Sequence, residues 1–223
     1  MRTIASLAAL TLVLSACQSS ESSRVMDTPV VETYRTNYAG PKAALSLGKF
    51  NNGSPYSRGI FGDGQDRLGG QARTILKTHL SQTGRFDLLD RENLEALGQE
   101  AGFSGQESQI AAANYVISGE VTEFGRKTTG DKQLFGVLGR GKRQAAQSKV
   151  SINVIDVRTS RVVHSVQGAG EFALSDREVI GFGSESGYDS TLNGKVLNLA
   201  ITDAVNKLVQ DIEAGVWSPE AGR

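Results

Sequence analysis

The single cysteine of this chain, Cys17, follows closely after an apolar run of eleven residues near the N-terminus. Arg2 places a positive charge ahead of the run Ile4–Leu14, and small residues close the run before the cysteine. A run of this length is too short to cross a bilayer as a helix, because spanning takes about 20 residues. The pattern is typical of a secretory signal peptide. Residues 1–16 are therefore expected to be cleaved off and to take no part in the fold.

The residues around the expected cleavage point, Leu14-Ser15-Ala16-Cys17, resemble the bacterial lipobox. In a lipobox the cysteine sulfur is joined to diacylglycerol, the chain is cut before it, and the new N-terminus is acylated. The alternative is an ordinary signal peptide with a chance cysteine. Buried acyl chains contribute about 0.8 kcal/mol per methylene, so several chains make a lasting anchor. Gln18 stands where a retention signal carries Asp, so the resemblance favours the outer membrane, with a covalent lipid on Cys17 and no other cofactor.

Composition argues against most catalytic chemistry. One cysteine excludes an internal disulfide and an all-cysteine metal site, and the chain has only two histidines. His79 beside a helix stripe is interpreted as a packed or partly exposed side chain. His164 lies in a strand with no neighbouring Cys or second His, so no metal site is expected. Gly168–Ala173 fits a dinucleotide-binding pattern only loosely, because strand alternation follows where a helix is required. We expect no enzyme; a hydrolase using His79 or His164 is the least favoured alternative. The 24 basic residues balance 24 acidic ones, so no overall charge indicates nucleic acid.

Hydrophobic periodicity predicts the element order β-α-β-α-β-β-β-α, an α+β sandwich with helices against one sheet. A helix is expected to begin at Asp66 and to stop at Gly84. A second helix is expected at 90–101, with Leu94 and Leu97 directed inward. The remaining expected elements are strands at 45–50, 86–89, 115–124, 149–157 and 162–166 and a long helix at 192–212.

These patterns give the following organisation of the chain. Residues 1–16 form the signal peptide, and 17–42 form a lipidated polar leader that lets the folded part stand off the membrane or wrap around a partner. Residues 43–217 form one α+β domain, and 218–223 form a short tail.

Two segments do not fit the core of this domain. Residues 125–149 carry seven Lys and Arg residues, and 168–190 alternate apolar and polar residues. Each is predicted as a β-hairpin, with tips near Gly139-Arg140-Gly141 and near Asp176. From the residues alone, long surface loops or protruding extensions of the sheet are the alternative, because neither segment has the full outward apolar band of a membrane strand.

Several stretches occur in an order that resembles the CsgG/HfaB family of outer-membrane lipoproteins, to which the curli secretion channel belongs. The resemblance covers nearly all of the mature chain. Its stretches are the lipobox 14–17, the strand, loop and helix of 45–80, Arg85-Phe86-Asp87-Leu88-Leu89-Asp90-Arg91 followed by Asn93-Leu94, Ala113-Asn114-Tyr115-Val116-Ile117-Ser118-Gly119-Glu120, Val154-Ile155-Asp156-Val157-Arg158-Thr159, and the C-terminal helix running toward Gly215-Val216-Trp217.

The resemblance implies a role for the two hairpins and for one loop. In the family's channels each subunit gives two β-hairpins to a transmembrane β-barrel shared by a ring of copies. The constriction lies on the loop after the first strand, where Tyr56, Ile60 and Phe61 match the family's spacing. A ring of such side chains would narrow the lumen so that only an unfolded chain passes. Ordinary loop or interface packing of these three residues is the alternative.

The function implied is a lipid-anchored, periplasm-facing outer-membrane protein of a bacterium. It would form a homo-oligomeric ring that passively exports unfolded curli-like fibre or adhesin subunits, helped by a periplasmic accessory factor. The second hairpin is shorter than in the curli channel, and the first is basic. These departures keep open the alternative of a non-pore lipoprotein that acts as a binding or regulatory module in the cell envelope.

Overall fold

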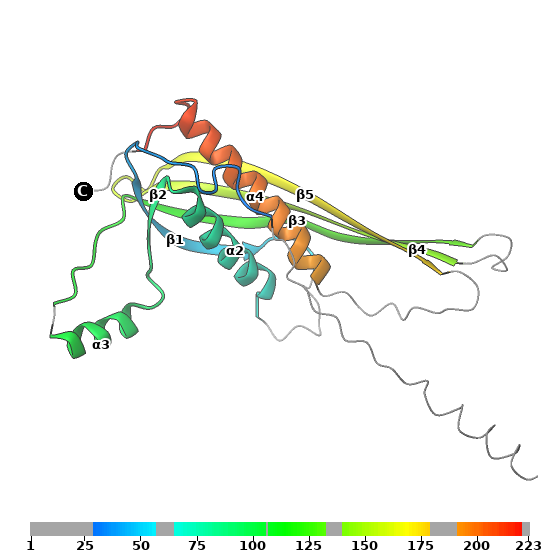
Figure 1. Ribbon diagram of the computed structural model, residues 1–223, viewed down its shortest axis with the longest axis horizontal. Coiled ribbons are helices and arrows are strands. Elements are labelled where there is room, and N and C mark those ends of the chain that lie inside the picture. The colour runs from blue at the N-terminus through cyan, green and yellow to red at the C-terminus, as the bar shows by residue number, and fades with distance from the viewer. Residues whose placement is uncertain (1–28, 57–64, 106, 133–139, 179–190, 220–223) are drawn as a thin grey trace, which may run out of the picture.

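The structure, a computed structural model, describes residues 29–56, 65–105, 107–132, 140–178 and 191–219 of the 223-residue chain (Figure 1). One five-stranded sheet, in the order β2-β1-β3-β4-β5, carries helices on one face. The elements are β1 (Ala43–Asn52), α2 (Arg67–Thr83), β2 (Phe86–Leu89), α3 (Leu94–Ser104), β3 (Tyr115–Lys132), β4 (Arg140–Asp156), β5 (Val162–Glu178) and α4 (Thr191–Glu213). The predicted element order and the α+β class are confirmed.

The sheet combines two kinds of strand pairing. β1 runs parallel to both β2 and β3, whereas β3, β4 and β5 form an antiparallel meander. Parallel neighbours need crossover connections, and α2 and α3 lie in the connections β1–β2 and β2–β3. The antiparallel part needs only turns, so β3 to β5 can extend far beyond the rest of the sheet (Figure 1).

The core lies between the sheet and the two helices α2 and α4. The predicted caps of α2 are present: Asp66 accepts a hydrogen bond from the Gly69 N–H at 2.8 Å, and Gly84 ends the helix in the left-handed conformation. The apolar residues Leu68, Ala72, Leu76 and Leu80 of α2 are buried, and α4 packs on α2, β4 and β5. Fully buried apolar side chains of this core include Leu45, Leu76, Leu80, Ile117, Val121, Val150, Ile152, Leu197, Ile201 and Leu208. Among the described residues, no helix combines the length and apolar character needed to span a bilayer.

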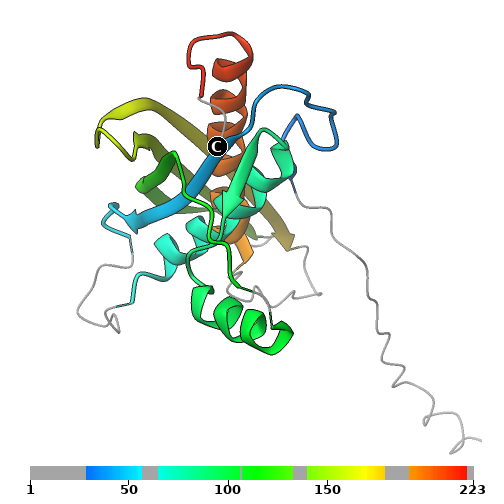
Figure 2. The ribbon, with the colours of Figure 1, turned by 90° about the vertical axis from the view of Figure 1, so that its left-hand side faces the viewer.

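The expectation for the second helix was wrong. α3 begins at Leu94 and has no buried residue, and Leu94 and Leu97 are 36% and 50% exposed rather than directed into the core. The helix stands apart from the sheet (Figure 2), and its entry is held by an ion pair between Lys77 and Asp90. The apolar spacing correctly predicted a helix but not a partner within the same chain.

The hairpin predictions are partly corrected. The arms of the first hairpin pair as expected, from Glu123 with Lys149 to Lys132 with Arg140. Arg140 therefore lies in a strand, and the turn falls within residues 133–139, outside the described residues.

The predicted tip at Asp176 was wrong. β5 continues to Glu178, and Asp176 pairs with Lys142 of β4. The backbone groups on the second edge of β4 need partners as much as those on the first, and a continuous β5 supplies them. Any return of the second hairpin lies in 179–190, outside the described residues.

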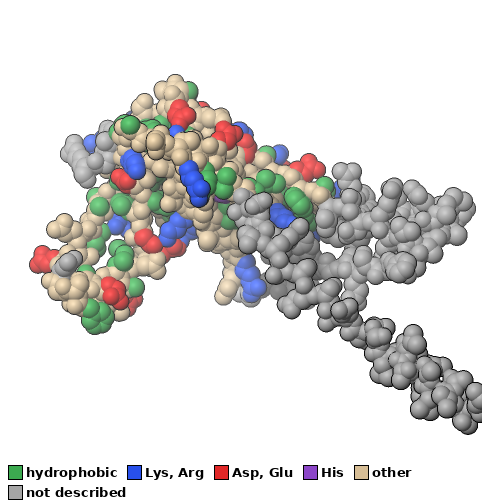
Figure 3. Space-filling model, viewed as in Figure 1, with side chains coloured by type: hydrophobic (Ala, Val, Ile, Leu, Met, Phe, Trp, Pro, Cys, Tyr) green, Lys and Arg blue, Asp and Glu red, His purple; other side chains and the backbone are tan. Residues whose placement is uncertain are grey.

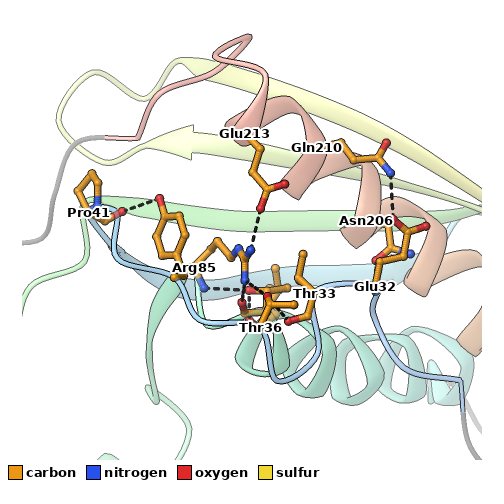
Figure 4. Close-up of polar contacts among 11 residues, drawn as sticks. Glu32, Thr33, Thr36, Pro41, Arg85, Asn206, Gln210 and Glu213 are labelled. Carbon is orange, nitrogen blue, oxygen red and sulfur yellow. Dashed lines mark hydrogen bonds and ion pairs between the residues drawn. The ribbon is translucent and has the colours of Figure 1, made fainter.

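Ordered contacts of the leader begin ahead of Ala43, where the domain was expected to start. Val31 is 1% exposed within the core, and the segment 29–42 crosses the C-terminal halves of α2 and α4 (Figure 4). This part of the leader is packed against the domain rather than extended into solvent.

Candidate functional site

The most prominent feature of the molecule is a three-stranded β-ribbon whose first rows lie under α4 and whose outer part projects beyond the helices (Figure 1). We define the ribbon as Glu123–Lys132, Arg140–Lys149 and Ala169–Glu178, which are ten residues of each strand in continuous cross-strand register. Its base is one row of paired residues, Glu123, Lys149 and Ala169. The side chains of Glu123 and Lys149 form an ion pair of 2.9 Å in this row.

On one side the ribbon begins where β1 ends. β1 pairs with β3 as far as Asn52 with Val121, and the N–H groups of Gly53 and Ser54 then donate to the Val121 carbonyl at 2.9 and 3.0 Å. Beyond Val121, no described strand pairs with the outer edge of β3. The described part of the chain thus covers this edge of the sheet up to the ribbon base and provides no strand partner beyond it.

On the other side, α4 closes the edge of β5 up to the same level. The Ala169 N–H donates to Asp203 Oδ2 at 2.9 Å, and Lys207 Nζ donates to the Gln167 carbonyl at 3.0 Å. Backbone groups of an edge strand that do not face a partner strand are available for another chain unless they are covered. Among the described residues, no strand pairs with the outer edge of β5. Among the described residues, strand pairing and covering contacts on the two edges therefore end at adjacent rows, at Val121 on β3 and at Ala169 on β5.

Two glycines allow α4 to lie this close to β5. A Cβ atom on Gly168 would be 2.1 Å from the Ala200 carbonyl oxygen, and one on Gly170 would be 2.7 Å from the Ala200 nitrogen. Glycine is required at both positions because any Cβ atom there would clash with the backbone of α4. The loose dinucleotide-binding pattern at these residues lies in a strand, as expected.

Tyr56 lies at the ribbon base, and the other two residues of the predicted constriction, Ile60 and Phe61, lie outside the described residues. The Tyr56 ring is 4.5 Å from the Phe124 ring, and its hydroxyl accepts a hydrogen bond from Asn193 Nδ2 at 3.1 Å. Tyr56 is thus held where the end of β1, the start of α4 and β3 meet. Its role in a pore stays a prediction. Phe124 was recognised as the end of an alternating strand, but Asn193 had no local signal.

The leader is held by α4 through polar contacts at two points (Figure 4). The Glu32 N–H donates to Asn206 Oδ1 at 3.0 Å, and Gln210 Nε2 donates to Glu32 Oε2 at 3.3 Å. Val31 fills the core beside them. The sequence predicts only a polar leader here, because the partners of these contacts lie more than 170 positions away.

Arg85 joins the leader to the ends of both packed helices (Figure 4). Its Nη1 donates to Thr36 Oγ1 and to the Thr83 carbonyl, and its Nη2 donates to Glu213 Oε1, each at 2.7 Å. The guanidinium carbon lies 4.9 Å from the centre of the Tyr38 ring. The side chain is only 6% exposed, so these charge-assisted contacts compensate for its burial.

Both histidines are largely packed side chains: His79 is 3% exposed and the His164 side chain 13% exposed. His79 Nε2 lies 2.5 Å from Asn198 Oδ1 and 3.1 Å from Thr202 Oγ1, which links α2 to α4 inside the core. His164 Nε2 lies 2.9 Å from Asp211 Oδ2. Within the part of the chain that the structure describes, no group of three or more His, Cys, Asp or Glu residues is placed to hold a metal ion.

Two carboxyl groups have perturbed pKa values, and both serve local structure. Hydrogen bonds from the side chains of Lys77 and Asn93 lower the pKa of Asp90. Hydrogen bonds from the side chain and backbone of Thr159 lower the pKa of Asp156. A general acid needs a raised pKa near the working pH, so these shifts indicate turn capping and not acid–base chemistry.

The fold and the site together define an α+β protein whose sheet extends beyond its helices as a ribbon with two open edges. A family model described as "Curli production assembly/transport component CsgG" matches residues 34–222. The chain is 56% identical over 213 residues to "Putative lipoprotein NMB1126/NMB1164" of Neisseria meningitidis serogroup B (strain ATCC BAA-335 / MC58), which covers 96% of this chain and 95% of that protein. The chain therefore belongs to the CsgG family, and the resemblance is confirmed.

Two solved structures illustrate more distant similarity. The PelC dodecamer from Paraburkholderia phytofirmans aligns with 81% of this chain and 93% of its own, at 15% identity and a TM-score of 0.34. Lipoprotein GNA1162 from Neisseria meningitidis aligns with 77% of this chain and 99% of its own, at 13% identity and a TM-score of 0.37. The family assignment rests on the two sequence matches and not on these alignments.

Proposed function

We propose that this protein is a lipid-anchored, homo-oligomeric secretion channel of the bacterial outer membrane that passively exports unfolded fibre or adhesin subunits. The observation that carries the proposal is the ribbon, on whose two edges the described residues provide no strand partner beyond adjacent rows at its base. Ten residues of strand span about 33 Å at 3.3 Å per residue. The hydrocarbon core of a bilayer is about 30 Å thick, and a membrane strand needs about 9 to 11 residues.

The open edges favour a ring of copies over a single subunit. In lipid, each backbone N–H and C=O must find a hydrogen-bond partner, and only a closed barrel provides this for strands. β3 and β5 run in the same direction, because each is antiparallel to β4. Antiparallel closure between copies therefore needs a fourth strand, and the predicted hairpin at 168–190 would supply it from residues beyond β5.

The remaining parts of the proposal follow from the family and the anchor. Lipid on Cys17 would hold the periplasm-facing domain at the outer membrane. Tyr56, Ile60 and Phe61 would narrow the lumen at the ribbon base, where Tyr56 lies. Members of this family are transport or binding proteins, so we propose no catalytic activity and no energy source of its own. A periplasmic accessory factor would close the vestibule.

The test is electron microscopy of detergent-extracted protein together with conductance in planar bilayers. Rings and discrete channel events support the proposal, and isolated monomers without conductance contradict it. The variant Ile60→Ala with Phe61→Ala should raise single-channel conductance, because it widens the constriction. Tyr34→Ala is the matched control, because Tyr34 lies in the leader and is 37% exposed. This variant should leave conductance unchanged.

A second candidate is a non-pore lipoprotein that binds a partner in the cell envelope. It is favoured by the charge of the ribbon, since both alternating sets of β4 contain basic residues: Arg140 and Lys142 in one, Arg143 and Lys149 in the other. A lipid-facing Arg or Lys at the bilayer midplane costs about 2–4 kcal/mol. This candidate predicts that Cys17→Ser yields a soluble monomer in which proteases cut within 125–149 and 168–190. Protection of both segments in bilayers would exclude it.

A further inference from the structure

α3 is held by its own subunit only at its start, and no other described element buries any of its residues. It has eleven residues, none of them buried, and Phe103 near its end is 84% exposed. Helices shorter than about 12 to 15 residues are marginal in water, and most helices in proteins depend on packing of one face. Figures 1 and 2 show α3 standing off from the sheet and the other helices. A helix of this kind indicates a partner outside the subunit.

One face of α3 is apolar and shallow. Leu94, Leu97, Gly98, Ala101 and Gly102 follow the spacing i, i+3, i+4, i+7 and i+8, which places them on one stripe. A Cβ atom on either glycine would meet nothing within 4 Å, so packing within the subunit does not require glycine there. Each glycine costs the helix about 1 kcal/mol relative to alanine. A partner that lies close against the stripe gives these glycines a purpose.

The segment around α3 is also acidic. From Glu92 to Asn114 the sequence contains no Lys or Arg, and Glu95, Glu100 and Glu107 are exposed. Figure 3 shows hydrophobic and acidic side chains together on this outlying part of the molecule. At 100° per residue, Glu95 and Glu100 lie on opposite flanks of the apolar stripe. The partner surface should therefore be apolar with basic groups at its sides.

The turn between β4 and β5 has these properties. Its residues 157–163 are all exposed, and they include Val157, Val162 and Val163, of which Val162 is 58% exposed. Arg158 and Arg161 are its only charged residues. This basic, valine-rich surface, which we call the β4–β5 turn surface, complements the α3 stripe in both polarity and charge.

The two surfaces lie next to opposite edges of the sheet. α3 follows β2, the strand at one edge, whereas the turn leads into β5, the strand at the other edge. Both lie at the end of the molecule away from the ribbon tip (Figure 1), and the end-on view separates them (Figure 2). A contact between different surfaces of two copies joins them head to tail, which closes into a ring when the rotation permits. The ribbon edges would join copies in the same sense.

We propose that α3 of one copy docks on the β4–β5 turn surface of the next copy. The inference rests on the proposed ring, and it adds a second contact that holds the ring together at the end opposite the ribbon. The valines of the turn cover the leucine stripe, and the arginines of the turn face the glutamates that flank it. The helix is thereby ordered by assembly.

The experiment is a charge swap in the full lipidated chain, with assembly measured by mass in detergent and by electron microscopy. Glu95→Arg with Glu100→Arg should weaken association at least about tenfold, because attraction is replaced by repulsion at two places. Arg158→Glu with Arg161→Glu should do the same, and the combination of all four should restore rings. Reversal of two exposed lysines, Lys42→Glu with Lys49→Glu, is the control with the same change of net charge as the arginine pair and should assemble normally.

A crosslink gives an independent readout. The chain has no cysteine besides Cys17, so Leu97→Cys in one preparation and Val163→Cys in another can form a disulfide only between copies. Mixed subunits should crosslink, and each variant alone should not. Rings that persist in the Glu95 and Glu100 variant, or a fourfold variant no better than either pair, would overturn the docking while leaving the channel intact. A wild-type protein without rings would overturn the proposed function itself.

Discussion

Replacement of Gly168 by alanine tests how α4 is seated on β5. The added Cβ would lie 2.1 Å from the Ala200 carbonyl oxygen and 2.5 Å from the Ala204 nitrogen. Both are backbone atoms inside a helix, so no side chain can rotate away to make room. Either α4 moves outward or β5 is pushed toward the other face of the sheet. In both cases the hydrogen bond between the Ala169 N–H and Asp203 is lengthened, and the edge of β5 is uncovered at the ribbon base.

The cost can be estimated from the same contacts. Overpacking by one or a few methylenes typically costs about 1–3 kcal/mol, and a clash with backbone belongs at the upper end, about 3 kcal/mol. Gly125→Ala in β3 is the matched control, because its Cβ would meet only the Gln147 side chain, at 3.8 Å. This control should be neutral or stabilise by about 0.4–1 kcal/mol through the unfolded state.

The assay is urea unfolding in detergent solution, with the slope of the free energy against urea concentration compared between variants. Gly168→Ala should lower the free energy of unfolding by about 3 kcal/mol or more relative to Gly125→Ala. If the two variants unfold within about 0.5 kcal/mol of each other, the close seating of α4 on β5 is refuted. An unchanged slope in both variants ensures that the comparison concerns stability alone.

Three further predictions concern the leader, the core and pH. Arg85→Met should lower the free energy of unfolding by about 2 kcal/mol and speed proteolysis within 29–42, because hydrogen-bonded partners are left without it; unchanged proteolysis would contradict this account of the leader. His79→Phe should cost about 1–3 kcal/mol in urea unfolding, since buried polar atoms of α4 lose their partner. Asp90 and Asp156 have lowered pKa values in the folded chain, so the unfolded chain binds more protons in acid. Their stabilising effect should be present above the ordinary value of 3.8 and disappear as the pH falls below it, and Asp→Asn variants measured against pH should lack this dependence.

Local signals predicted the elements well because each signal acts through neighbouring residues. Asp66 caps α2 through a backbone N–H three positions on, and Gly84 ends it through its own backbone conformation. Strand alternation likewise gave β3 and β5. Alternation does not say where a strand stops, however, because a ladder continues as long as a neighbour supplies partners. Alternation and the polar residues around Asp176 therefore predict a tip there, although β4 extends beside it.

Leu94 and Leu97 show a different limit. Their spacing predicts an amphipathic helix that needs a partner, and that part of the prediction was correct. Periodicity carries no information on whether the partner belongs to the same chain or to another one. If the core is assumed to be built from one chain, the two leucines are predicted to point into it. In the structure they are exposed.

The level of the ribbon base could not be predicted because contacts from remote parts of the chain set it on each edge. Gly53 and Ser54 end the pairing on β3 at Val121, and Asp203 covers Ala169 on β5. These contacts come from the end of β1 and the middle of α4, yet they fall on adjacent rows of the sheet. Because the rows are adjacent, the two edges of the ribbon extend over nearly equal lengths beyond these contacts. Because neighbouring copies can pair only along open edges, the position of α4 on β5 also sets how far such pairing reaches toward the body. The two glycines that seat α4 are therefore as important for the proposed assembly as the residues of the ribbon itself.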